Sequence, residues 1–220
     1  MPWNPAERRA LADALESAGP GAPTLCEGWS SEHLAAHVVL RESAPLVAAG
    51  IALPFLADRT KRVTQALGDR STTPAAYAAL VERVRREPPP WHPLRLAGDP
   101  AQLAEMFVHT EDVRRGGVDG SAVPRRPLPS GMEDALWGTL RRMARRLYQD
   151  APCRVVLQDG TGRELVLAPR SSTAPGAGVT VVGPVGELLL HAFGRTSAAH
   201  VEIRGASPEV VTAFERSRPR

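Results

Sequence analysis

The sequence predicts an α+β protein with a helical bundle over residues 1–150 and a small α+β domain over residues 151–220. Two observations carry this prediction. Before residue 150, apolar residues recur at the three- and four-residue spacing of amphipathic helices. After it, short aliphatic and β-branched runs are separated by turn signals, which is typical of strands.

The first helices are recognised by where they begin and end. A helix over Ala6–Ala18 ends at Gly19-Pro20-Gly21, because glycine and proline both terminate helices. After a loop, Ser30 or Ser31 can cap a second helix that runs to about Ser43. A weaker helical stretch covers Leu56–Leu67.

The later helices begin with a capping residue followed by proline or by a helix-forming run. Thr73-Pro74 opens a helix to Glu87, and Asp99-Pro100 opens another that stops at Gly116-Gly117. Ser130 is expected to cap a long helix through Leu147, with its arginines outside and its apolar face closing the bundle. These helices complete an all-α unit of four main helices and shorter pieces.

The C-terminal part alternates strands and helices. An Asp-Gly turn at Asp159-Gly160 lies between two aliphatic runs and predicts a hairpin. The expected elements, in order, are strands at Arg154–Gln158, Glu164–Ala168 and Val179–Val182, a helix at Pro184–Phe193, a strand at Val201–Arg204 and a helix at Pro208–Arg216. About 65 residues form a marginal domain alone, so we expect this unit to pack on the helical one.

Composition narrows the possible functions. The chain has 220 residues and a formal net charge of +3, which is too small to indicate nucleic-acid binding. We expect no membrane span and no secretory signal, since no apolar run is long enough for either. Two cysteines, Cys26 and Cys153, do not make a disulfide framework, so we expect a cytoplasmic protein.

Three residues form a candidate metal site: His37 on the second helix, and Glu105 and His109 on the helix that follows Pro100. Glu105 and His109 are four residues apart, so they share one helix face. Imidazole and carboxylate ligands suit Zn²⁺ best here, with Ni²⁺ or Fe²⁺ also possible. Three protein ligands leave a coordination position open, as in catalytic sites.

Other interpretations of these residues remain open on spacing alone. Glu105 and His109 could be a surface ion pair, and His37 a core histidine. His33 and His37 are also four residues apart but lack the intervening glutamate that a metalloprotease helix needs. Cys26 is a possible further ligand, although a small-residue role in its loop is preferred. Arg41 is expected to be solvated.

Two stretches of the chain resemble a known family. The first runs Cys26-Glu27-Gly28-Trp29-Ser30-Ser31-Glu32-His33-Leu34-Ala35-Ala36-His37. The second combines Val179-Thr180-Val181-Val182-Gly183 with a leucine-rich helix that ends in Gly194-Arg195. Both are similar to the mycothiol-dependent maleylpyruvate isomerase family, whose members join a DinB-like metal-binding four-helix bundle to a C-terminal α/β domain.

The resemblance implies a function and a set of site residues. It assigns His37, Glu105 and His109 as metal ligands and Arg195 as a catalytic residue facing the site. It implies mycothiol as cosubstrate and a metal-dependent isomerase or thiol S-transferase acting on a small electrophile. The alternative is a non-catalytic metal-binding or ligand-binding DinB-like protein. The expected partners are a small-molecule thiol and the electrophile, in a monomer or homodimer.

Overall fold

The computed structural model describes residues 3–43, 57–88, 99–117, 122–169 and 178–218. The described residues contain eight helices and a four-stranded mixed sheet, so the predicted α+β class is confirmed. The chain divides into two compact units, Met1–Asp119 and Gly120–Arg220. None of the described helices is both long and apolar enough to cross a membrane.

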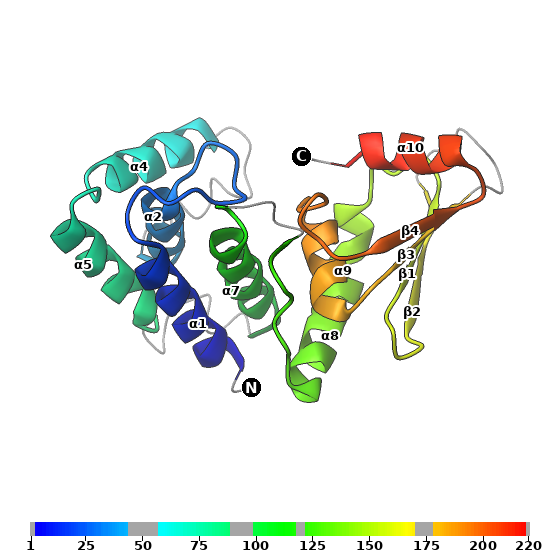
Figure 1. Ribbon diagram of the computed structural model, residues 1–220, viewed down its shortest axis with the longest axis horizontal. Helices are drawn as coiled ribbons and strands as arrows, with labels where there is room; N and C mark the ends of the chain where they lie inside the picture. The colour runs from blue at the N-terminus through cyan, green and yellow to red at the C-terminus, as the bar shows by residue number, and fades with distance from the viewer. Residues whose placement is uncertain (1–2, 44–56, 89–98, 118–121, 170–177, 219–220) are drawn as a thin grey trace. The chain divides into compact units, whose positions relative to one another are not determined.

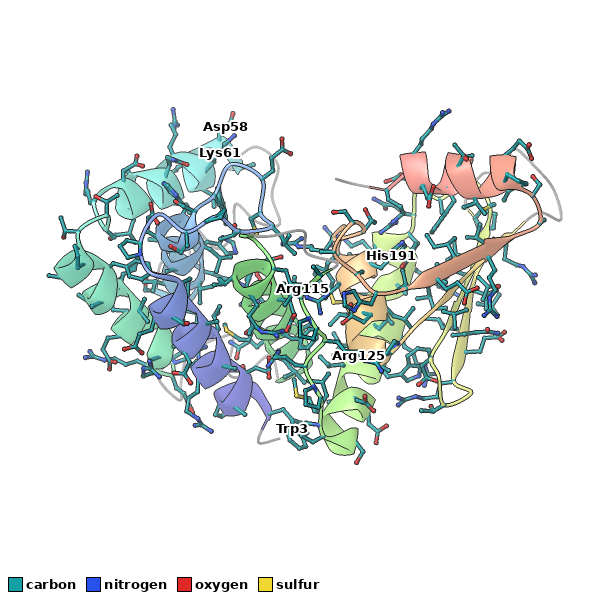
Figure 2. The ribbon with its side chains drawn as sticks, viewed as in Figure 1. Trp3, Asp58, Lys61, Arg115, Arg125 and His191 are labelled. Carbon is teal, nitrogen blue, oxygen red and sulfur yellow. The ribbon has the colours of Figure 1, made fainter. Side chains whose placement is uncertain are left out.

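The first unit is helical (Figure 1). Its helices are α1 (Trp3–Ala18), α2 (Ser31–Ser43), α4 (Ala57–Asp69), α5 (Pro74–Arg85) and α7 (Asp99–Arg114). Helix α1 packs along α7 and α5, while α2 packs along α4 and α5. Their apolar faces form one buried cluster, which includes Leu11, Leu34, Leu80, Val84 and Met106. Asp58 and Lys61 instead lie on the exposed face of α4 (Figure 2).

The turn that precedes α2 is held by internal hydrogen bonds and by one to α7. Gly28 has a φ of 74°, a left-handed conformation that glycine adopts without steric cost. The Thr24 hydroxyl donates to the carbonyl of Trp29 at 2.7 Å and accepts from the backbone N–H of Cys26 at 3.2 Å. The N–H of Leu25 donates to the carbonyl of Asp112 on α7 at 3.0 Å. This turn therefore holds its side chains at a fixed place beside α7.

The capping predictions had different outcomes. Thr73 caps α5 as expected, since its hydroxyl accepts from the N–H of Ala76 and Pro74 is the first helical residue. Ser130 does not cap the next helix: it is itself the first helical residue, and Pro129 occupies the cap position without a side-chain hydrogen bond. The extended Pro129 lets the helix begin one residue earlier than the serine signal indicated.

The second unit combines three helices with the sheet (Figure 1). Its elements are α8 (Ser130–Leu147), β1 (Arg154–Gln158), β2 (Glu164–Leu167), β3 (Gly178–Val182), α9 (Val185–Ala192), β4 (Glu202–Gly205) and α10 (Pro208–Arg216). The sheet order is β2-β1-β3-β4, in which β1 and β3 are parallel and both edge strands are antiparallel. In the central strand β1, Val155, Val156 and Leu157 are all buried, as in a strand covered on both faces.

The long helix α8 belongs to the second unit, where it packs against α9. The compact units therefore divide before α8, whereas the sequence places the domain boundary after it, near residue 150. Near residue 150 the spacing of apolar residues changes from that of a helix to that of a strand. A compact unit, however, is defined by the contacts between its elements and not by this spacing. Arg141, Arg142, Arg145 and Arg146 are exposed on α8, as its amphipathic pattern predicts.

Candidate metal centre

Helices α2 and α7 bring the three predicted ligands together. The Nε2 atom of His37 lies 3.4 Å from Oε1 of Glu105, and Nε2 of His109 lies 3.2 Å from the same oxygen. One ligand atom from each of the three residues falls within 4.8 Å of the others. The two imidazole rings meet edge to face, with centroids 5.3 Å apart. Two nitrogens and one oxygen in this arrangement fit the donor set that Zn²⁺ prefers.

Each predicted ligand is largely buried but keeps part of its side chain exposed. The His109 side chain is 9% exposed, that of His37 is 13% exposed, and that of Glu105 is 23% exposed. The ring of Trp29 lies 5.1 Å from the ring of His37, between centroids. Trp29 therefore packs on a proposed ligand, from the turn whose conformation Gly28 permits.

A buried carboxylate holds the second nitrogen of His109. Nδ1 of His109 lies 2.9 Å from Oδ2 of Asp112, and the Asp112 side chain is fully buried. The thiol of Cys26 donates to the same oxygen across 3.1 Å. Histidine ligands of metals commonly donate their other N–H to a carboxylate, which fixes the ring and its tautomer. The spacing of Asp112, three residues after His109, was a signal that sequence reasoning did not use.

The charges of the site depend on one another. Although burial raises the pKa of Glu105, hydrogen bonds from His109 and His37 hold it well below its usual value. Burial lowers the pKa of His109, but hydrogen bonds with Asp112, Cys26 and Glu105 raise it well above its usual value. Burial lowers the pKa of His37, and the Glu105 hydrogen bond only partly offsets this. The His109 ring thus hydrogen-bonds to two carboxylates, and a cation that binds Nε2 has to displace the proton held there.

Arg41 is not solvated, contrary to expectation. Its side chain is only 12% exposed, and its Nε lies 3.7 Å from Oε1 of Glu105. Arg41 follows His37 by one turn of α2, so both face α7. The arginine is therefore adjacent to the candidate metal centre.

The other candidate ligands are placed elsewhere. His33 is buried between α2 and α4, where its ring contacts Ser30, Asp69 and Gln65. A Cβ on Gly68 would lie 2.3 Å from the His33 ring, so the two helices approach closely there. His33 thus acts in helix packing. Cys26, His109 and Asp112 form a second group with mutually close ligand atoms, which shares His109 with the first.

Arg195 lies in the second unit, just after α9. Its Nη1 donates to the carbonyl of Phe193 at 2.7 Å, and its backbone N–H donates to the carbonyl of Leu190 at 3.0 Å. Gly194, the residue before Arg195, has a φ of 86° and ends the helix in a left-handed turn. The catalytic role expected of Arg195 stays a prediction.

Comparison with known proteins identifies the fold. No protein-family model matches the chain, and no curated protein matches its sequence. Among solved structures, the chain is similar to the mycothiol-dependent maleylpyruvate isomerase, with a TM-score of 0.55 and 18% identity over 93% of this chain and 90% of that one. It is also similar to a histidine-to-alanine variant of that enzyme, with a TM-score of 0.54 and 17% identity over 92% and 91% of the two chains. This protein therefore has the fold of the mycothiol-dependent maleylpyruvate isomerase along nearly its whole length.

Proposed function

We propose that the protein is a metal-dependent enzyme that uses a small-molecule thiol, mycothiol, either to isomerise a small electrophile or to transfer the thiol onto it. The observation that carries this proposal is the convergence of His37, Glu105 and His109 on one point between α2 and α7. The fold shared with a mycothiol-dependent isomerase supports the choice of thiol. We expect the reaction to take place in the cytoplasm.

The chain's own residues prepare the site for a divalent cation, with zinc as the best match. Asp112 fixes the ring of His109, Trp29 packs on the ring of His37, and Glu105 supplies the negative charge. Within the described residues, this donor group contains three side chains, which leaves room for an external ligand. A divalent cation held there favours the deprotonated form of a thiol, whose ordinary pKa is about 8.5.

The chemistry of a thiolate suits two reactions. It adds to an electrophilic carbon of a double bond conjugated to a carbonyl, so that a C–S bond forms while the π electrons move onto the carbonyl oxygen. Rotation about the resulting single bond and expulsion of the thiolate give the other geometric isomer. If a proton is instead added at the neighbouring carbon, the thioether remains and the reaction is an S-transfer. Arg195 is the proposed partner for negative charge on the electrophile.

Metal analysis of the purified protein tests the site. We expect about one zinc ion per chain, lost in both His37→Ala and His109→Ala, because two of three ligands cannot hold the ion tightly. His33→Ala is the matched control, since that histidine packs against α4 and should leave the metal content unchanged. Full retention in both ligand variants would reject the site.

A thiol-consumption assay tests the reaction. Zinc-loaded protein is incubated with mycothiol and a panel of conjugated unsaturated acids, and free thiol and alkene geometry are followed. Isomerisation without net loss of thiol identifies an isomerase, while stoichiometric loss identifies a transferase. Zinc binding with neither outcome would instead support the alternative, a metal-binding protein without catalysis.

A further inference from the structure

One nitrogen of the Arg41 guanidinium is unsatisfied among the described residues, beside the candidate metal centre. Its Nη1 is buried and has no hydrogen-bond partner among the described residues. Its ion-pair partner among the described residues is Glu105, whose Oε1 is 3.7 Å from Nε, beyond hydrogen-bonding distance. A guanidinium stays positively charged in proteins, so burial does not remove its need for an acceptor.

A second buried arginine in the same unit shows how this fold satisfies a structural guanidinium. Arg8 on α1 donates to both carboxylate oxygens of Glu42 and to the carbonyl of Val84 at 2.9 Å. Its side chain is 2% exposed. The part of the chain that the structure describes offers Arg41 no comparable set of acceptors. Because a buried donor without a partner is costly, this difference indicates a group that awaits an external acceptor.

The position of Arg41 limits what that acceptor can be. It follows His37 by one helical turn, so the two side chains leave α2 roughly 5–6 Å apart. A planar guanidinium pairs best with a carboxylate through two parallel hydrogen bonds. A ligand that reaches both the metal centre and Arg41 must therefore place its carboxylate only a few bonds from its reacting carbon.

We propose that Arg41 binds the carboxylate of the electrophile and so selects short unsaturated acids as substrates. The inference deepens the proposed function and rests on it for the identity of the reacting centre. Arg41 acts from the same helix as His37, independently of any role of Arg195. It orients the acid so that the carbon near its carboxylate faces the external position left by the three metal ligands.

Calorimetric titration of the full-length, zinc-loaded protein with maleate, a short dicarboxylate, tests this assignment. We expect Arg41→Gln to weaken maleate binding by about 10- to 100-fold, as for the loss of a charge-assisted hydrogen-bond pair. The maleate affinity of Arg41→Lys should lie between those of the wild type and Arg41→Gln, because lysine keeps the positive charge but lacks the planar guanidinium. Arg83→Gln, at an exposed position on α5, is the matched control and should bind like the wild type.

Two further measurements separate the possible failures. Zinc content and the circular dichroism spectrum are recorded for each variant, so that loss of the metal or of the fold is not mistaken for loss of the carboxylate site. Maleate is also titrated after the thiol has been added: binding that persists and depends on Arg41 supports the inference, while binding abolished by the thiol places the carboxylate on the metal. If the folded, zinc-loaded Arg41→Gln variant binds maleate as tightly as the wild type does, the inference about Arg41 is overturned.

The same comparison remains decisive if the protein binds no zinc. That result would remove the proposed function, and the maleate titrations would then be made on the metal-free protein. Maleate binding lost in Arg41→Gln alone would support a carboxylate site at Arg41, and binding that is absent or insensitive to Arg41 would reject it.

Discussion

Asp112 lies outside the proposed ligand set but contacts one of its members. Its carboxylate is fully buried and accepts from Nδ1 of His109 at 2.9 Å and from the thiol of Cys26 at 3.1 Å. Because Nδ1 is held by Asp112, Nε2 is the nitrogen that faces Glu105, so Asp112 sets the orientation in which Nε2 can ligate once a cation replaces its proton. We regard it as a positioning residue.

Replacing this carboxylate by an amide should weaken the metal site without emptying it. We expect Asp112→Asn to reduce zinc affinity by about 10- to 100-fold, as for other outer partners of metal-bound histidines. Competition with a chromophoric chelator measures the affinity. Asp69→Asn removes the carboxylate that contacts His33 at 3.1 Å and is the control, with unchanged affinity expected. Equal affinities in the two variants would contradict the positioning role.

A second buried histidine belongs to the second unit. His191 on α9 (labelled in Figure 2) forms a cluster of three rings with Tyr148 and Phe214, in which each pair of centroids is 5.9 to 6.3 Å apart. Its Nδ1 lies 2.8 Å from the Tyr148 hydroxyl. The guanidinium of Arg218 lies 4.1 Å above the centre of the Tyr148 ring. Burial, and then the positive charge of Arg218, lowers the pKa of His191 to about 4.

This shift predicts a loss of stability in acid. His191 takes up its proton near pH 6.5 in the unfolded chain but only near pH 4 in the folded protein. Between these two pH values the unfolded state therefore binds more protons than the folded state. Stability should therefore fall as the pH drops through that window, by about 3 kcal/mol in total for this group. Urea unfolding from pH 7 to pH 4 measures it. In His191→Gln this contribution should vanish, and an unchanged pH dependence would contradict it.

At the scale of elements, the C-terminal end of α7 and the turn before α2 are nearly in contact. A Cβ on Gly116 would lie 2.3 Å from the carbonyl oxygen of Pro23 and from the Cα of Thr24. Both are backbone atoms, which cannot move aside as a flexible side chain can. The turn carries Cys26 and Trp29, so this close approach also fixes two side chains of the site.

A methyl group at this point should separate the turn from α7. We expect Gly116→Ala to destabilise the protein by about 1–3 kcal/mol, as for overpacking elsewhere, and to weaken zinc binding. Gly117→Ala is a neighbouring control, because a Cβ there meets only the Pro23 ring at an ordinary 3.8 Å. Thermal unfolding of both variants measures the difference in stability. A Gly116→Ala variant as stable as Gly117→Ala would show that the contact is easily relieved.

At the scale of the whole molecule, all three proposed metal ligands belong to the first unit. A ligand that binds only the folded state stabilises it by about 2.7 kcal/mol at one hundred times its Kd. Zinc should therefore slow amide hydrogen exchange in α2 and α7. The strands of the second unit should show a much smaller effect, because they supply no ligand.

Hydrogen exchange measured by mass spectrometry, with zinc and with a chelator, makes this comparison. His109→Ala serves as the control that should remove the zinc-dependent protection. Protection that is confined to the second unit, or that persists in His109→Ala, would place the metal somewhere other than between α2 and α7.

The sequence by itself determined the parts of this protein that depend on local spacing. The helices, the hairpin at Asp159-Gly160 and the Thr73 cap follow from periodicity and turn chemistry, which act over a few residues. Glu105 and His109 could be paired for the same reason, since four residues make one helical turn.

Only the tertiary structure decided which helix faces meet. Arg41 could not be distinguished from a solvated arginine by sequence, because it packs beside Glu105 on α7, which lies 64 positions further along the chain. The link from Cys26 to Asp112 likewise joins residues 86 positions apart. The assignment of α8 to the second unit has the same cause: an amphipathic pattern shows that a helix buries one face, while packing chooses the surface that covers it.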